Sequence, residues 1–320
     1  MTKTSTTTTS TNGQAVRRMR FAFSTVSCPK WDFETICARA KEYGYGGVEI
    51  RGFLNESMLT AANVFHSDPA KVRAMFQYHG VAIACLASSV AMSWNRKKDR
   101  KAAEEARQFI DMAATLECPL VKIFDTVVQP GTVVAPTRWG NHSRASAAVA
   151  FGDWMLPLGD YAAERGVTIV VEGALSFRSA KEMWLILDRL NHPSIACCWD
   201  VFNAALIGES PYVSVPTLNS RIQYAQVKDA KIGPLGATYC KLGDGDVPVQ
   251  KFLTRLMGIG YDGWVTFEWE KAWLPNIAEP EEVLPHAITK MREWTKSGED
   301  IEGAEGDSEP AAAAKGTVVA

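Results

Sequence analysis

The chain has 320 residues, of which 47% are hydrophobic, enough for one domain with a sizeable core. Lys and Arg number 34 against 36 Asp and Glu, so the basic excess typical of nucleic-acid-binding proteins is missing. No apolar run approaches the roughly 20 residues that a membrane-spanning helix needs. The seven cysteines form no CxxC pair, which favours a reducing, cytoplasmic location over a disulfide framework.

Short apolar runs rich in β-branched residues alternate along the chain with longer segments of helical periodicity. Gly44, Gly80 and Gly166 follow three of the expected helices, at positions where glycine commonly ends a helix. In chain order we expect strand 20–25, helix 31–43, strand 47–50, helix 69–78, strand 81–86, helix 96–116, strand 120–124, helix 143–165, strand 167–172, helix 179–190, strand 195–200, an irregular segment with Pro211 and Pro216, strand 222–228, helix 249–259, strand 264–268 and helix 280–295.

Eight strands separated by helices in about 280 residues favour an α/β fold closed into a single (β/α)₈ TIM barrel. An open doubly wound sheet is the competing fold, but it usually has fewer strands, and no GxGxxG loop follows the first strand here. We expect the barrel to span residues 19–296. The Thr- and Ser-rich segment 1–18 and the Glu-, Gly- and Ala-rich segment 297–320 are predicted to be disordered.

Four polar residues lie at or near the ends of the last four predicted strands: Glu172, Asp200, Gln226 and Glu268. The carboxyl ends of barrel strands open onto one mouth, where converging carboxylates would repel each other and raise each other's pKa. A divalent cation removes this conflict, and oxygen ligands favour Mn²⁺ or Mg²⁺. The four residues are therefore predicted to hold one such ion, although a single acid at a strand end more often caps a helix or forms a salt bridge.

Further residues near the strand ends are candidates for contact with a substrate. His142, in the long loop after the fourth strand, has the near-neutral pKa that suits proton abstraction, although a lone loop histidine is usually a surface residue. Lys228 is expected to hold a substrate oxygen or phosphate, with a salt bridge to Asp229 as the alternative. Glu49 and Trp269 are kept as substrate-binding candidates, the tryptophan because its ring stacks well on a sugar.

Six segments resemble the xylose-isomerase-like TIM barrels, a group of sugar phosphate isomerases and epimerases: YGGVEIR (45–51), VE (171–172), WDVFN (199–203), QVKD (226–229), LGDGD (242–246) and GYDGWVTFE (260–268). The family's metal ligands, Glu, Asp, His and Glu, fall on Glu172, Asp200, Gln226 and Glu268. Some relatives that resemble 3-dehydroshikimate dehydratases also carry Gln in place of this His. Two other family histidines correspond to Asn203, kept as a substrate-binding candidate, and Ala174. These departures speak against a standard ketose epimerase.

The resemblance implies a metal-dependent isomerase or epimerase that acts on a carbohydrate or cyclic polyol. Glu172 and Glu268 would exchange a proton beside a carbonyl while the metal stabilises the enediolate, and His142 is the other candidate base. A lyase on the same scaffold, either a dehydratase or an enzyme that cleaves 3-keto-glycosides, is the alternative. A non-catalytic sugar-binding barrel or enzyme subunit and a DNA-repair endonuclease are further readings, the last weakened by the charge balance. No membrane or nucleic-acid partner is expected, and a homo-oligomer is left open.

Overall fold

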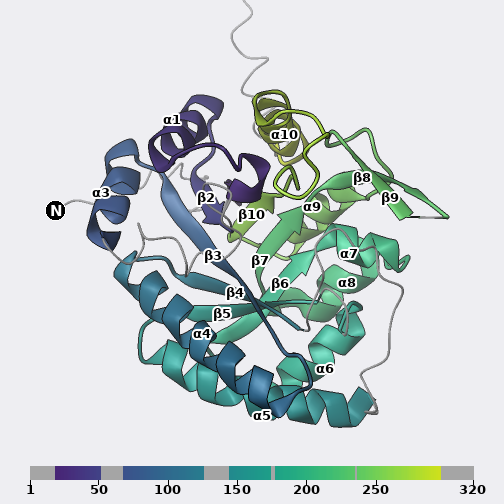
Figure 1. The fold of residues 1–320 in the computed structure, drawn as a ribbon. Helices are drawn as coiled ribbons and strands as arrows, with labels where there is room; N and C mark the ends of the chain where they lie inside the picture. Colours follow the sequence, from purple (N-terminus) through teal and green to yellow (C-terminus); the bar gives the residue numbers. More distant parts are fainter. Residues whose placement is uncertain (1–18, 52–67, 126–143, 174–176, 235, 297–320) are drawn as a thin grey trace, which may run out of the picture.

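The computed structural model describes residues 19–51, 68–125, 144–173, 177–234 and 236–296. Within them, eight parallel strands close into a barrel in the order β1-β10-β7-β6-β5-β4-β3-β2 (Figure 1), which confirms the predicted (β/α)₈ fold. The strands are β1 (Arg20–Ser24), β2 (Gly47–Ile50), β3 (Ala82–Ala91), β4 (Leu120–Phe124), β5 (Thr168–Glu172), β6 (Ile195–Asp200), β7 (Ile222–Val227) and β10 (Trp264–Phe267).

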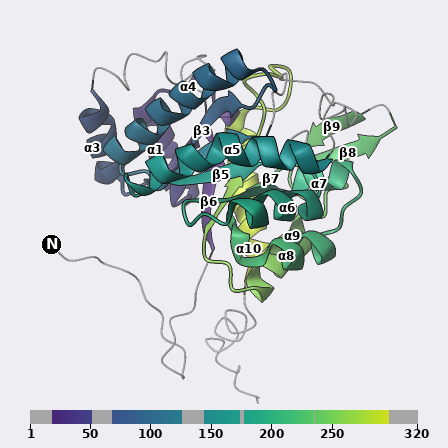
Figure 2. The ribbon, with the colours of Figure 1, turned by 90° about the horizontal axis from the view of Figure 1, so that it is seen from below.

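Helices form a ring around the outside of this barrel, as the two perpendicular views show (Figures 1 and 2). Local sequence signals set their ends: Asp32 caps α1 by accepting from the Thr35 N–H, and Gly44 ends it in the left-handed conformation that glycine tolerates. The helices are α1 (Phe33–Tyr43), α3 (Pro69–His79), α4 (Arg96–Thr115), α5 (Arg144–Ala163), α6 (Ala180–Leu190), α7 (Val201–Leu206), α8 (Pro211–Leu218), α9 (Val249–Gly258) and α10 (Pro280–Trp294), with 3₁₀ turns η1 (Thr25–Ser27) and η3 (Asn219–Arg221).

Two segments after β6 and β7 differ from the prediction. The expectation of an irregular segment around Pro211 was wrong, because Ser210 caps α8 and Pro211 occupies its first turn, where a missing N–H costs nothing. The segment after β7 forms an antiparallel hairpin of β8 (Asp229–Gly233) and β9 (Gly236–Cys240), which stands off the barrel. This hairpin was not predicted.

Side chains inside the barrel change character along its axis. Successive residues of a strand point to opposite faces, so every second residue enters the interior. Away from the carboxyl ends of the strands, the interior holds an apolar cluster with one tyrosine, whose hydroxyl accepts a hydrogen bond from Thr266. The cluster consists of Ala22, Ala84, Cys85, Leu120, Val170, Ala196, Cys198, Tyr224 and Trp264. Charged residues end or directly follow four of these strands, β5, β6, β7 and β10, at the barrel mouth.

No helix in the described ranges combines the length and the apolar character that crossing a bilayer requires.

Candidate active site

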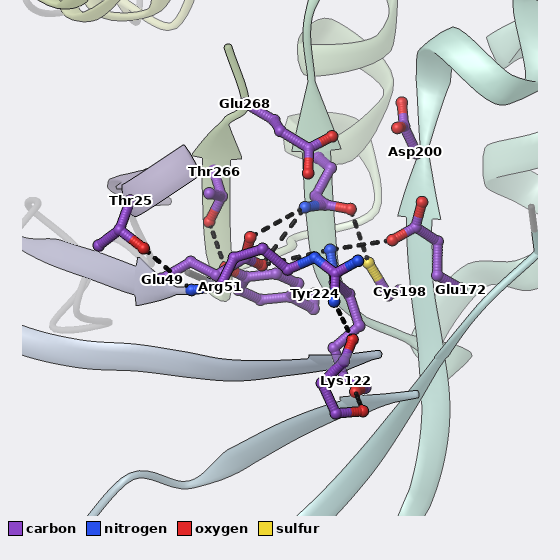
Figure 3. A network of polar contacts seen from close by, with 12 residues as sticks. Thr25, Glu49, Arg51, Lys122, Glu172, Cys198, Asp200, Tyr224, Thr266 and Glu268 are labelled. Atoms are coloured by element: carbon purple, nitrogen blue, oxygen red, sulfur yellow. Dashed lines mark hydrogen bonds and ion pairs between the residues drawn. The ribbon is translucent and has the colours of Figure 1, made fainter. Parts of the chain in front are cut away.

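The four predicted metal ligands come from adjacent parts of the barrel wall. Asp200 on β6 pairs in register with Gln226 on β7, and Gln226 pairs with Thr266 on β10, two residues before Glu268. Glu172 ends β5, the strand next to β6. Figure 3 shows Glu172, Asp200 and Glu268 projecting from different strands into one region at the mouth. The exposed fractions of the three residues are only 3–5%, so all three carboxylates are almost completely buried.

Lys228 joins two of these carboxylates. Its ammonium lies 3.1 Å from Asp200 Oδ2, 3.1 Å from Glu270 Oε1 and in close contact with Glu268 Oε2. Lys228 therefore pairs with the site carboxylates, and the alternative salt bridge to Asp229 does not form.

Asp229 has a structural role instead. Its carboxylate accepts hydrogen bonds from the backbone N–H groups of Gly243, Gly245 and Val247 at 2.8–3.2 Å. A Cβ added at Gly245 would lie 1.8 Å from Asp229 Oδ1, so only glycine fits there. The QVKD and LGDGD motifs thus meet, and their contact fixes the chain that follows Lys228.

A second lysine, which the sequence reasoning missed, lies deeper in the barrel. Lys122 on β4 is fully buried, and its ammonium lies 2.9 Å from Glu172 Oε2 and 3.5 Å from Glu49 Oε2. The sequence could have indicated this position: Lys122 lies two residues from both Leu120 and Phe124, and alternation within the strand points it into the barrel.

The amide of Gln226 has a defined orientation. Its Nε2 donates to both oxygens of Glu49, at 3.3 and 3.4 Å, and its Oε1 accepts from Cys198 Sγ at 3.4 Å. An ionised carboxylate only accepts hydrogen bonds, so the NH₂ group must face Glu49 and the carbonyl oxygen must face away from it. Gln226 thereby keeps an oxygen, the atom a hard cation binds, on the side away from Glu49.

The two lysines control the charge states of the acids. Burial raises the pKa of Asp200 to about 6. Burial would also raise the pKa of Glu268, but the Lys228 and Lys122 ammonium groups outweigh it and lower that pKa to about 2. Burial opposes the charge of each lysine, yet the adjacent carboxylates prevail and raise both lysine pKa values well above the usual range.

The side chains present fit a divalent cation in donor type and in charge. Glu172 Oε2 and Asp200 Oδ2 are buried atoms without a hydrogen bond, although an ammonium lies within ion-pair distance of each. Five carboxylates against three cationic side chains leave an excess of two negative charges, which one divalent ion would balance. These eight residues are Glu49, Glu172, Asp200, Glu268, Glu270, Arg51, Lys122 and Lys228.

The same carboxylates do not yet surround one point. In the described part of the chain, no three His, Cys, Asp or Glu side chains converge as they would around a bound metal ion. Lys228 lies between Asp200 and Glu268, and Lys122 lies beside Glu172, so the ammonium groups hold the carboxylates in this arrangement. Binding of a metal here requires Lys228 to move from the oxygens that it now contacts.

The remaining predicted residues have diverse surroundings. Asn203 on α7 belongs to the site, because its Nδ2 donates to Glu172 Oε1 at 3.1 Å. Glu49 is fully enclosed and faces Gln226, so a direct contact with substrate stays a prediction. Trp269 is 2% exposed, stacks on Phe267 and donates its indole N–H to the Ala278 carbonyl, so sugar stacking by Trp269 also stays a prediction. His142 lies outside the described residues.

Two further residues at the mouth were missed. Arg51 follows β2, and its position two residues after Glu49 places it on the interior face by the same alternation as Lys122. Tyr239 comes from the unpredicted hairpin, so sequence reasoning had no means of placing it. Its ring lies 5.5 Å from that of Phe202, and burial raises the pKa of its phenol, with the charge of Glu270 adding to the rise.

Comparisons with known proteins agree with this architecture. The model of the xylose isomerase-like TIM barrel family matches residues 37–294. No curated protein sequence matches the chain. Among solved structures, IolI protein with a bound zinc atom has a TM-score of 0.70 and 16% identity, over 86% of this chain and 98% of that one.

Two further solved structures share the fold. The probable 3-DHS dehydratase AsbF from Bacillus anthracis has a TM-score of 0.67 and 14% identity, over 85% of this chain and 98% of its own. The apo form of 3-keto-D-glucoside 4-epimerase YcjR from E. coli has a TM-score of 0.68 and 12% identity, over 86% of this chain and 100% of its own. Relatives with one barrel therefore carry names of different reaction types, and at these identities the likeness shows the fold alone.

Proposed function

We propose that this chain, which belongs to the xylose isomerase-like TIM barrel family, is a divalent-metal-dependent isomerase or epimerase of a keto-sugar, inosose or sugar phosphate. One observation carries the proposal: Glu172, Asp200 and Glu268 reach one barrel mouth from different strands, and two of their buried oxygens have only a lysine ammonium beside them and no hydrogen bond. Such oxygens are costly in a folded protein unless a cation or substrate satisfies them.

Glu172, Asp200, Glu268 and the carbonyl oxygen of Gln226 would hold the ion, with Mn²⁺ or Mg²⁺ favoured by an all-oxygen ligand set. A bound divalent ion supplies Lewis-acid stabilisation of the negative charge that develops on substrate oxygens beside the reacting carbon. The metal of the IolI structure is zinc, so the choice of ion needs a direct measurement.

The chain's own residues perform the proton transfer. Glu172, at the end of β5, and Glu268, directly after β10, take a proton from one face of the carbon beside the carbonyl and return one on the other. Glu268 becomes a stronger base when the Lys228 ammonium leaves it, because that contact lowers its pKa. The freed Lys228 ammonium donates to a substrate oxygen, and Asn203 holds Glu172 in place through its hydrogen bond.

The test combines metal content with hydrogen exchange. Purified protein is analysed for metal by mass spectrometry, before and after EDTA treatment and reloading with Mn²⁺. D-fructose, D-tagatose and scyllo-inosose are then incubated in D₂O and followed by NMR. We expect about one ion per chain and metal-dependent exchange of a C–H beside the carbonyl, lost in Glu172→Gln and Glu268→Gln. The exposed Glu164→Gln is the matched control. A protein that binds no Mn²⁺, or exchange that persists in both site variants, contradicts the proposal.

A lyase is the second candidate, favoured by Tyr239. Its phenol keeps its proton because burial raises the pKa, and it lies beside Glu270 at the mouth, so it can protonate a leaving oxygen. Exchange into solvent without loss of water or aglycone supports the isomerase. Loss of a leaving group that slows in Tyr239→Phe supports the lyase, and sugar binding without either reaction supports a non-catalytic barrel.

A further inference from the structure

Arg51 differs from the other two cationic side chains of the site because it has no counter-ion among the described residues. Lys122 and Lys228 each contact at least two carboxylates, whereas no described carboxylate lies within 4.0 Å of the Arg51 guanidinium. Arg51 is nevertheless only 9% exposed. A guanidinium buried to this degree without an anion is unfavourable, so a partner for it is expected.

The guanidinium is held by contacts that leave three of its five N–H donors without a described acceptor. Nη1 donates to the carbonyl of Ser88 and, at 3.3 Å, to Ser89 Oγ. The guanidinium carbon lies 4.9 Å from the ring centre of Phe124 and 5.6 Å from that of Trp273. Nε and Nη2 donate to no described group, and neither is among the fully buried atoms that lack a partner. Two parallel donors of a planar fork are therefore open to an oxyanion.

Arg51 also lies within reach of the reacting groups. Figure 3 shows the Arg51 side chain extending from the end of β2 toward the centre of the labelled side chains. A ligand held between Glu172 and Glu268 would place a further group, a few bonds away, at the guanidinium.

We propose that Arg51 binds an oxyanion of the substrate, a carboxylate or a phosphate, and so selects acidic over neutral sugars and cyclic polyols. This inference rests on the proposed function of the same mouth. It narrows the substrate class, because a neutral ketose leaves the guanidinium without an anion.

The test compares acidic ligands with neutral counterparts on Mn²⁺-reloaded protein by isothermal titration calorimetry. One pair is quinate and its methyl ester, and the other is D-fructose 6-phosphate and D-fructose. We expect the acid of one pair to bind at least roughly 10-fold tighter than its neutral counterpart. The pair that shows the preference identifies carboxylate or phosphate as the anion.

Three variants assign the preference to Arg51. In Arg51→Gln the affinity ratio of that pair should fall to about 1, while the neutral member binds within roughly twofold of wild type. Arg51→Lys keeps the positive charge but loses the paired N–H donors, so it should give an affinity ratio between those of wild type and Arg51→Gln. Arg20→Gln is the matched control, since Arg20 also lies over an aromatic ring, that of Trp264, at 4.4 Å.

The outcomes separate this inference from the proposed function. Mn²⁺ content, measured on the same samples, tests the metal site alone. Metal-loaded protein that binds neither member of either pair, that binds both members equally, or that keeps its preference in Arg51→Gln and Arg51→Lys overturns the role of Arg51. Protein without Mn²⁺ contradicts the proposed function, and an Arg51-dependent ratio would still support the anion site.

Discussion

Two buried lysines of one barrel differ in depth and in the number of their partners. Lys122 projects from the middle of β4, is fully buried and lies between Glu49 and Glu172. Lys228 follows the end of β7, is 4% exposed and contacts three carboxylates around the mouth. Both ammonium groups neutralise acids that would otherwise repel each other.

The difference in depth indicates different roles. The Lys122 ammonium has no open space to enter, so it is a fixed part of the interior that holds Glu49, and through Glu49 the amide of Gln226. Lys228 occupies the space between Asp200 and Glu268 that a metal ion would take, so it can be displaced. We therefore expect Lys122 to stabilise the fold and Lys228 to compete with a metal ion for Asp200 and Glu268.

The largest expected effect is the loss of the deeper charge. Lys122→Met leaves Glu49 and Glu172 buried without their cation and should lower the free energy of unfolding by about 3–5 kcal/mol. Guanidinium chloride denaturation followed by circular dichroism measures it on metal-free protein. Lys228→Met should cost less, because two of its three carboxylates, Glu268 and Glu270, keep 6% and 15% of their side chains exposed. Equal losses in the two variants would remove the distinction between the lysines.

The pH dependence of stability tests the mouth. The Asp200 pKa of about 6 lies above its ordinary value of 3.8, so the folded state binds this proton more tightly than the unfolded state. Stability of metal-free protein should therefore rise as pH falls from about 6 toward 4, by on the order of 3 kcal/mol at about 1.4 kcal/mol per pKa unit. Glu268 acts in a lower window: its lowered pKa gives stability that is lost only as pH falls toward 2.

The metal should reverse this trend. A cation binds ionised Asp200, so the stabilisation by Mn²⁺ should decrease as pH falls below about 6. Denaturation curves at pH 5 and 7.5, with EDTA or with Mn²⁺, compare the two states. Burial raises the pKa of Glu49 as well, and Asp200→Asn separates the two acids. If the dependence in EDTA is unchanged in Asp200→Asn, the titrating group is not Asp200.

Displacement of Lys228 can be measured as metal affinity. Without an ammonium 3.1 Å from Asp200 Oδ2, Lys228→Met should bind Mn²⁺ on the order of 100-fold more tightly, because a like charge no longer opposes the ion. Titration calorimetry of EDTA-treated protein gives the constants. Lys290→Met, on the outer helix α10, where the ammonium pairs with Glu293 at 3.1 Å, is the control. Weaker binding in Lys228→Met would mean that Lys228 supports the metal rather than competing with it.

The sequence was sufficient for the fold because each strand carries its own signal. Strands 47–50, 120–124 and 195–200 were predicted to the residue, since apolar runs between turn residues leave little freedom. The position of Glu172, Asp200, Gln226 and Glu268 at one mouth followed from the parallel order of the strands. That they would act as metal ligands remains a prediction.

The sequence was not sufficient for the partners of these acids. Lys122 and Arg51 lie at interior positions that strand alternation identifies. Lys122 was missed because it lies in the middle of its strand rather than at the end, and Arg51 was missed because it was assigned to the loop after β2. Tyr239 depends on a hairpin whose glycines read as a loop. Which carboxylate pairs with which lysine depends on barrel shear and side-chain rotamers, which no local pattern encodes.

The smallest expected effect concerns Gln226, where the resemblance to the family leads one to expect histidine. Gln226→His should keep the contact between Glu49, deeper in the barrel, and the acids at the mouth. One ring nitrogen can donate to Glu49 while the other faces the mouth. An imidazole among carboxylates favours Zn²⁺, so the ratio of Zn²⁺ to Mn²⁺ affinity should rise roughly 10-fold over wild type. Competition titrations with both ions measure the ratio. Glu49→Gln combined with Gln226→His removes the acceptor that orients the ring, and the gain should then disappear. A gain that survives this double change would show that Glu49 does not orient the side chain at position 226. Lys122 with Glu49, deeper in the barrel, and Lys228 with its carboxylates at the mouth would then act independently.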